Sequence, residues 1–243
     1  MRPFDPSRFA RVRLLEGPTP IQELHRLNAE LGGVRLFVKR DDLIGVGGGG
    51  NKLCKLEFLL GEAKTLGADT IITVGARQSN HARLTAAAAA RAGFACELVL
   101  PHVVARNDED YLRNGNVLLD GLFGARVHAL AGDADVPKFV GERLGELASE
   151  GRKAYFAPVG GSNAIGCLGY VICALEIEEQ AAALGVEFSK VIVANGSSGT
   201  HAGLAAGFAL TPRVRLSPNP MRSTIRPTNP ARLRFPSRSR RWR

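Results

Sequence analysis

A glycine-rich stretch leads directly into a lysine that could act as a nucleophile. Gly45 to Gly50 contains five glycines, and Asn51 and Lys52 follow. Lys52 falls in the first turn of an expected helix, Leu53 to Leu66, where the positive helix end and partial burial both disfavour a protonated amine. We expect a lowered pKa, which suits Schiff-base formation with a carbonyl cofactor. The alternative is a solvent-exposed lysine after a flexible loop.

The same glycines do not favour a nucleotide site. A phosphate-binding P-loop requires Gly-Lys followed by Ser or Thr, whereas Asn51 precedes the lysine and Leu53 follows it. The dinucleotide pattern Gly-x-Gly-x-x-Gly is matched only because the stretch is almost all glycine. The sequence therefore gives only weak support to either kind of nucleotide site.

A second small-residue loop could hold a phosphate group. Gly196-Ser197-Ser198-Gly199-Thr200 precedes an expected helix, His201 to Leu210, so backbone N–H groups and three hydroxyls would meet at a helix N-terminus. The alternative is a helix cap whose small residues allow close packing. Together with Lys52, this loop indicates pyridoxal phosphate.

Gln78-Ser79-Asn80-His81 supplies further polar groups. Ser79 would cap the helix that begins at Asn80, and its hydroxyl and the adjacent amides would favour an anion, such as a substrate carboxylate. The alternative is a simple capping serine beside a solvated histidine.

Alternating strands and helices must position these three loops. This order is typical of α/β proteins with parallel sheets, in which ligands bind beyond the carboxyl ends of the strands. The strands are expected at 34–39, 70–74, 95–100, 126–130, 153–157 and 190–194, and the helices at 21–31, 53–66, 80–91, 108–123, 136–150, 165–184 and 201–210.

The net charge of +9 comes from the C-terminal segment. Residues 211–243 contain ten arginines, six prolines and no acid, which leaves 22 basic against 23 acidic side chains in residues 1–210. This composition predicts a disordered tail. A break of this kind within a repeating architecture is what a reading-frame shift would produce, and an evolved basic arm is the alternative.

The remaining composition favours a soluble cytoplasmic protein. We expect neither a signal peptide nor a membrane span, because no apolar run approaches the roughly 20 residues that a spanning helix needs. The four cysteines form no Cys-x-x-Cys pair and have no histidine at metal-ligand spacing, so reduced thiols and no metal site are expected.

Six motifs in order resemble those of one enzyme family. The chain is similar, from about Gly17 to Leu210, to the fold-type II pyridoxal-phosphate enzymes of the branch that includes D-cysteine desulfhydrase and 1-aminocyclopropane-1-carboxylate deaminase. The motifs are Lys39-Arg40-Asp41-Asp42, Gly49-Gly50-Asn51-Lys52 with Lys55-Leu56-Glu57, Gln78-Ser79-Asn80-His81, Tyr111-Leu112-Arg113-Asn114-Gly115-Asn116, Pro158-Val159-Gly160-Gly161-Ser162 and Gly196-Ser197-Ser198-Gly199-Thr200-His201.

The resemblance implies two parallel-sheet α/β domains of the tryptophan synthase β-like type. The larger cofactor domain would comprise 1–53 and 166–210, and the smaller one 54–165. The C-terminal part of the larger domain is expected to be missing, with the tail 211–243 in its place. A homodimer of the family type is also implied.

The resemblance also implies roles for several of the motif residues. Lys52 would hold pyridoxal phosphate covalently and, with Ser79, carry the catalysis. The cofactor would further contact Asn51, Asn80 and the loop residues Gly196, Ser197, Ser198, Gly199 and Thr200. The substrate would contact Ser79, Asn80 and His81.

The expected reaction is β-elimination from a small amino acid, D-cysteine giving pyruvate, sulfide and ammonia. Within the branch, Asn80-His81 and Thr200-His201 look more like the desulfhydrase group than the deaminase group. Deamination of 1-aminocyclopropane-1-carboxylate and sulfo-lyase action on L-cysteate are alternatives. An alternative of another class is a truncated inactive product whose basic tail binds acidic partners without specificity. A specific nucleic-acid partner and a membrane are not expected.

Overall fold

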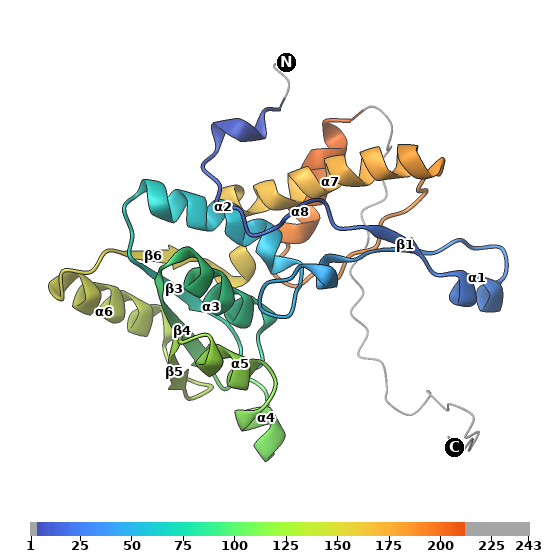
Figure 1. Ribbon diagram of the computed structural model, residues 1–243. Helices are drawn as coiled ribbons and strands as arrows, with labels where there is room; N and C mark the ends of the chain where they lie inside the picture. Colours follow the sequence, from blue (N-terminus) through green and yellow to red (C-terminus); the bar gives the residue numbers. More distant parts are fainter. Residues whose placement is uncertain (1–3, 212–243) are drawn as a thin grey trace.

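Strands and helices alternate through the middle of the chain (Figure 1). The computed structural model describes residues 4–211. The central part comprises α2 (Lys52–Thr65), β3 (Thr70–Val74), α3 (Asn80–Ala92), β4 (Ala95–Pro101), α4 (Glu109–Arg113), α5 (Asn116–Leu122), β5 (Arg126–Leu130), α6 (Val136–Ser149) and β6 (Ala154–Ala157). The other elements are the 3-10 helices η1 (Pro6–Arg8), η2 (Asp41–Leu43) and η3 (Val159–Gly161), β1 (Ile21–Glu23), α1 (His25–Leu31), β2 (Phe37–Lys39), α7 (Ala164–Leu184) and α8 (Gly199–Ala209).

The central strands form one parallel sheet in the order β5-β4-β3-β6. The expected α/β class with a parallel sheet is therefore confirmed. Because the strands are parallel, the loop after β3 and the loop after β6 leave the same edge of the sheet. Those loops carry Ser79 and the segment around Gly160.

The two faces of the sheet are covered by different helices. Ile71 and Leu98 belong to the main core, which includes apolar residues of α2 and α3, whereas their neighbours Ile72 and Val99 pack with Val140 of α6. This alternation follows from the two-residue period of a strand.

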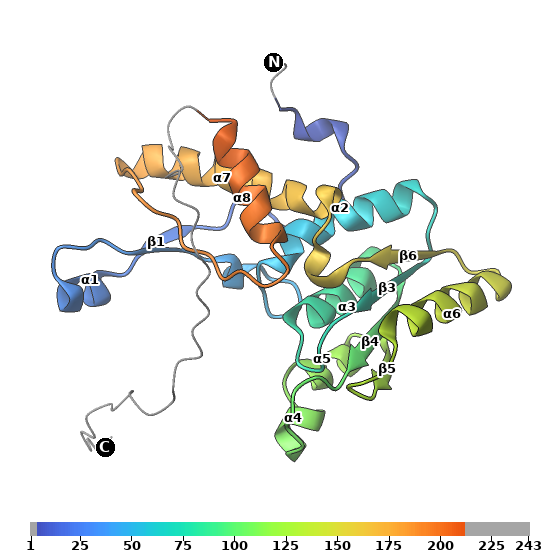
Figure 2. The same ribbon diagram turned by 180° about the vertical axis from the view of Figure 1, so that it is seen from behind.

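Helices α7 and α8 pack together, and α7 also packs against α2, so α2 lies between α7 and the helix α3 of the sheet (Figures 1 and 2). Glycines allow this close approach. A Cβ atom on Gly169 of α7 would lie 2.0 Å from the carbonyl oxygen of Cys54 in α2, and one on Gly203 of α8 would lie 2.5 Å from the carbonyl oxygen of Cys167. This packing brings the N-terminus of α8 to the N-terminus of α2.

Four expected elements differ from the structure. Ile21–Glu23 is a strand, β1, paired antiparallel with β2, so the helix expected from Ile21 begins only at His25. The strand expected at 34–39 shortens to Phe37–Lys39, and that expected at 190–194 finds no ladder partner among residues 4–211. The helix expected over 108–123 breaks at Asn114 and Gly115, because Gly115 has φ +61°. The tail expected for 211–243 falls, apart from Thr211, outside the described residues.

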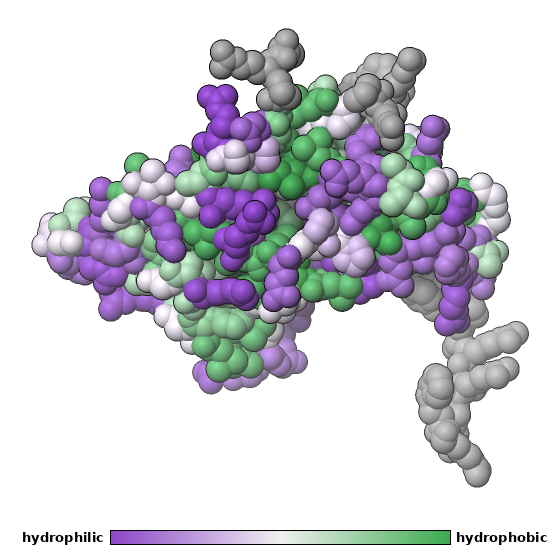
Figure 3. All heavy atoms as spheres, turned by 45° about the horizontal axis from the view of Figure 1, so that its top comes forward, coloured by the Kyte–Doolittle hydropathy of each residue, from purple (hydrophilic) through white to green (hydrophobic). Residues whose placement is uncertain are grey.

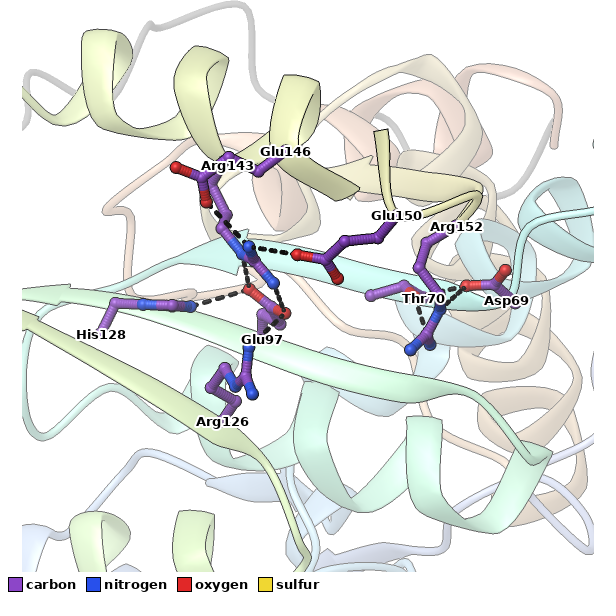
Figure 4. Close-up of polar contacts among 9 residues, drawn as sticks. All are labelled: Asp69, Thr70, Glu97, Arg126, His128, Arg143, Glu146, Glu150 and Arg152. Carbon is purple, nitrogen blue, oxygen red and sulfur yellow. Dashed lines mark hydrogen bonds and ion pairs between the residues drawn. The ribbon is translucent and has the colours of Figure 1, made fainter. Parts of the chain in front are cut away.

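An ion network fastens α6 to the sheet (Figure 4). The buried carboxylate of Glu97 in β4 accepts hydrogen bonds from Nε and Nη2 of Arg143, both at 2.8 Å, and it lies 2.7 Å from Nε2 of His128. Arg143 also donates to Glu146 and Glu150 of its own helix. The Arg143 guanidinium, with further contributions from His128, lowers the pKa of Glu97 to about 2.

Replacing Glu97 by Gln should lower the free energy of unfolding at neutral pH by about 2–4 kcal/mol, because Arg143 then loses its buried partner. The stabilisation is present above pH 4.5, the ordinary pKa, and is lost as pH falls toward about 2. The difference between variant and parent should therefore shrink over that range in urea titrations. Glu142→Gln on the exposed side of α6 is the control. An equal loss in both variants would contradict a special role for Glu97.

The surface mixes hydrophilic and apolar residues, and green and purple groups are intermingled on the face in Figure 3. Exposed apolar side chains include Leu122 and Ile192, which are 69% and 80% exposed. Among the helices described, none combines the length and apolar character that crossing a membrane requires.

Candidate active site

The glycine turn before Lys52 has a backbone that only glycine adopts readily. Gly47, Gly48, Gly49 and Gly50 have φ angles of +58°, +79°, +72° and +138°. A Cβ atom on Gly49 would lie 2.1 Å from the carbonyl oxygen of Asp42. The turn therefore depends on glycine both for its conformation and for space, and it delivers Lys52 as the first residue of α2.

Gly49→Ala should destabilise the protein by roughly 2–5 kcal/mol, through the positive φ and the overlap with Asp42. Gly45→Ala is the matched control, since no heavy atom lies within 4 Å of the Cβ atom it would add. Urea unfolding of both variants measures the effect. Equal midpoints for the two would show that the turn tolerates side chains.

Lys52 lies partly buried at the start of α2. Its Nζ donates a 3.0 Å hydrogen bond to Oδ1 of Asn51, and Nδ2 of Asn51 donates to Oγ1 of Thr200 at 3.2 Å. Burial lowers the pKa of the Lys52 amine. Within residues 4–211 no carboxylate pairs with it. The amine is therefore shifted toward its neutral, nucleophilic form, as the sequence predicts.

The loop before α8 places hydroxyls and backbone N–H groups at a helix N-terminus. Ser198 has φ +63° and is the residue that precedes the first turn, which begins at Gly199. The Ser197 and Ser162 hydroxyl oxygens are 2.8 Å apart. A Cβ atom on Gly160 would lie 2.2 Å from Oγ of Ser197, so the loop and η3 are in direct contact. This arrangement suits an anionic group.

Lys55 is a site residue to which the sequence interpretation assigns no role. Its side chain is 1% exposed, and its Nζ donates to the Gly160 carbonyl at 3.0 Å and to Oγ of Ser162 at 3.3 Å. Burial, and then the Lys52 charge, lowers the pKa of Lys55 to about 8. No carboxylate within the described part of the chain lies within ion-pair distance of it. Its spacing, three residues after Lys52 and hence on the same helix face, is the signal that could have found it.

Ser79 and Asn80 begin α3, as expected. Oγ of Ser79 accepts a 3.2 Å hydrogen bond from the Ala82 amide and so caps the helix. Oδ1 of Asn80 accepts a 3.0 Å hydrogen bond from Nδ2 of Asn116 in α5. Both residues face the space in front of Lys52.

His81 is 4% exposed, which excludes the solvated histidine of the capping interpretation. Its Nε2 lies 2.8 Å from Oγ1 of Thr73. Because the Thr73 hydroxyl donates to the Ala157 carbonyl at 2.7 Å, Nε2 must be the donor to Thr73. Burial and the charges of Lys52 and Lys55 lower the pKa of His81 to about 3, so the ring is neutral.

One cavity of about 280 Å³ brings the predicted residues together. Asn51 and Gly199 adjoin it, through the hydrogen bonds of Asn51 and as the first residue of α8. The lining residues are Lys52, Gly75, Ala76, Ser79, Asn80, His81, Val159, Gly160, Ala194, Asn195, Gly196, Ser197, Ser198 and Thr200. A larger hollow of about 580 Å³, beside β1, β2 and the end of α7, contains none of these residues.

The donor set of the cavity fits pyridoxal phosphate. The half-buried amine of Lys52 can react with an aldehyde, and the N-terminus of α8 with its hydroxyls can hold a phosphate dianion. The buried cation of Lys55 stands directly behind that loop, since a Cβ atom on Gly199 would lie 2.9 Å from its Nζ. A buried ammonium without a carboxylate partner is costly unless an anion is bound beside it.

Comparison with known proteins also points to pyridoxal phosphate as the cofactor. The chain is 47% identical over 211 residues to the D-cysteine desulfhydrases of Serratia proteamaculans (strain 568) and Yersinia enterocolitica, covering 86% of this chain and 64% and 63% of those proteins. The crystal structure of an ACC deaminase homologue superimposes with a TM-score of 0.75 at 43% identity, over 84% of this chain and 60% of that one.

A crystal structure of a T.th. threonine deaminase matches with a TM-score of 0.58 at 23% identity, over 80% of this chain and 56% of that one, and supports the fold alone. The chain spans less than two thirds of the length of each of these relatives. The model of the family described as "Pyridoxal-phosphate dependent enzyme" matches residues 12–232. This chain therefore belongs to the pyridoxal-phosphate dependent enzymes.

Proposed function

We propose that the protein catalyses β-elimination from a small amino acid, and that D-cysteine and water are converted to pyruvate, sulfide and ammonia. The observation that carries the proposal is the cavity that unites Lys52, the Ser79–Asn80 helix start and the loop before α8. The identity of 47% to proteins named D-cysteine desulfhydrase supports the substrate.

The segment Gly196–Thr200 and Lys55 would bind the cofactor phosphate. The loop offers amides and hydroxyls, and Lys55 offers the positive charge. Asn51 would keep Lys52 beside this loop, because its side chain bonds to both Lys52 and Thr200. The phosphate would thus be held at one end of the cavity while Lys52 reaches the reactive end.

When bound, the cofactor supplies an electron sink for the negative charge that develops at the substrate Cα. Lys52 would attach the cofactor and take up or deliver the Cα proton at Nζ, a role that its lowered pKa favours. Ser79 and the free amides of the α3 N-terminus would hold the substrate carboxylate. Asn80 would contact the ring hydroxyl of the cofactor.

His81 would contact the substrate as an uncharged part of the cavity wall. Its ring is buried against Thr73 and its pKa lies near 3, so it stays uncharged through the neutral range. A neutral imidazole adds no charge of its own beside the substrate carboxylate.

Sulfide release from D-cysteine by the purified protein with added pyridoxal phosphate tests the proposal. We expect sulfide and pyruvate in equal amounts. Turnover of 1-aminocyclopropane-1-carboxylate or L-cysteate in place of D-cysteine would contradict the proposed substrate but agree with the proposed cofactor chemistry. Absence of turnover of all three amino acids, with no cofactor uptake, would favour the inactive product with a basic tail.

We also propose how the chain is divided into domains, where the protein is located and how it assembles. We assign residues 1–53 and 166–210 to a larger cofactor domain and 54–165 to a smaller one, a division supported by the confinement of the parallel sheet to 70–157. We also propose a cytoplasmic location and a homodimer, with no specific nucleic-acid partner. The four cysteines are free thiols, which fits a reducing compartment.

A further inference from the structure

The side-chain amide of Asn80 has a fixed orientation at the wall of the cavity. Oδ1 of Asn80 accepts a 3.0 Å hydrogen bond from Nδ2 of Asn116, which lies on α5. Nδ2 of Asn80 donates to no group among residues 4–211. The nitrogen of this amide is therefore its free hydrogen-bonding atom.

The assignment of oxygen and nitrogen in this pair follows from a third residue. Nδ2 of Asn116 also donates to the backbone carbonyl of Gln78, at 2.8 Å. A backbone carbonyl can only accept a hydrogen bond, so the atom of Asn116 that faces it must be the nitrogen. The same nitrogen faces Asn80, and Asn80 must therefore turn its oxygen toward Asn116 and its nitrogen away.

Asn116 is itself held by the side chain of Gln78. Nε2 of Gln78 donates to the carbonyls of Tyr111 and Asn114 at 2.7 and 2.9 Å, and Oε1 accepts from the amide of Asn116 at 2.9 Å. A Cβ atom on Gly115, which has φ +61°, would lie 2.9 Å from Oε1 of Gln78. The start of α5 is thus fastened to the residue directly before Ser79.

We propose that Asn116 is a positioning residue that fixes the amide of Asn80 as a hydrogen-bond donor toward an acceptor oxygen of the bound cofactor. The inference rests on the proposed function, in which that acceptor is the oxygen of the ring hydroxyl of pyridoxal phosphate. Without Asn116 the Asn80 amide can turn over and present its oxygen instead. Two facing acceptor oxygens repel each other, so the orientation decides whether the contact is favourable.

Asn116→Asp tests this role, because an aspartate has a similar shape but cannot donate to Asn80. Titration of the purified protein with pyridoxal phosphate should show an affinity about 10-fold or more below that of the parent, with a changed visible absorbance of the bound cofactor. Asn114→Asp is the matched control. It adds the same charge two residues earlier and keeps an acceptor for the Gly115 amide, which the Asn114 side chain binds at 2.8 Å.

A double-mutant cycle separates positioning from general damage. If Asn116 acts through Asn80, Asn116→Asp should have no further effect on affinity or absorbance in an Asn80→Ala background. Asn116→Ala, which adds no charge, should give a smaller loss that also vanishes in that background. Thermal unfolding of each variant reports whether it folds.

Two results would overturn the inference while leaving the proposed function intact. One is an equal effect of Asn116→Asp with and without Asn80. The other is parent-like cofactor affinity and absorbance in both Asn116 variants. A parent protein that takes up no pyridoxal phosphate would overturn both. The two failures are therefore distinguishable in one set of titrations.

Discussion

Lys52→Ala should abolish covalent attachment of pyridoxal phosphate and reduce sulfide release from D-cysteine on the order of 10³-fold or more. The lysine is the amine that lines the cavity, and burial lowers its pKa. Removing it takes away both the nucleophile and the group that moves the Cα proton. The expected signs are loss of the visible absorbance of the lysine-bound cofactor and loss of the sulfide signal.

Lys64→Ala is the control for this experiment, because Lys64 lies exposed in the last turn of the same helix. It should keep both the absorbance and the activity. Retention of the covalent cofactor in Lys52→Ala would point to Lys55 as the attachment site, since its pKa is also lowered. Sulfide release by Lys52→Ala at the parental rate would remove Lys52 from the mechanism.

Lys55→Met should weaken the binding of pyridoxal phosphate and of inorganic phosphate about 10- to 100-fold, because the substitution removes the buried positive charge beside the segment proposed to hold the phosphate. Methionine keeps much of the length of the side chain and removes the charge. Phosphate should raise the thermal midpoint of the parent but not of this variant. Lys64→Met, which changes an exposed lysine in the same way, should respond to phosphate like the parent.

The same substitution should change how stability depends on pH. In the folded protein the pKa of Lys55 is about 8, below its ordinary value of 10.5. Between these values the unfolded chain binds more protons than the folded one, so the stability of the parent rises with pH over that range. The variant lacks this titration, and its stability relative to the parent should therefore fall by roughly 3 kcal/mol from neutral pH to above 10.5. Parallel pH profiles for both proteins would contradict an uncompensated buried lysine.

Local patterns were sufficient to predict most elements of the central α/β part. The expected strands 70–74 and 126–130 match β3 and β5, and the expected helix from Asn80 begins at that residue with Ser79 as its cap. These elements have clear apolar periods and strong boundary residues, so neighbours in sequence determine them.

Elements whose form depends on distant partners were predicted poorly. Residues 21–23 have a helix-compatible sequence, yet pairing with β2 makes them a strand. Residues 190–194 alternate as a strand should, but no strand pairs with them among the described residues. A strand is completed by hydrogen bonds to another segment, and its own residues cannot supply that partner.

The sequence alone predicts the chemical groups of the candidate site: a lysine after a glycine turn, a hydroxyl-rich loop at one helix start and a capping serine at another. Residue type and local spacing carry that information. The tertiary structure alone shows that Lys55 is buried behind the loop before α8, that the ring of His81 lies beside Thr73, and that Asn116 donates a hydrogen bond to Asn80. These contacts join side chains from different elements, and their burial and hydrogen-bond partners exist only once those elements have packed.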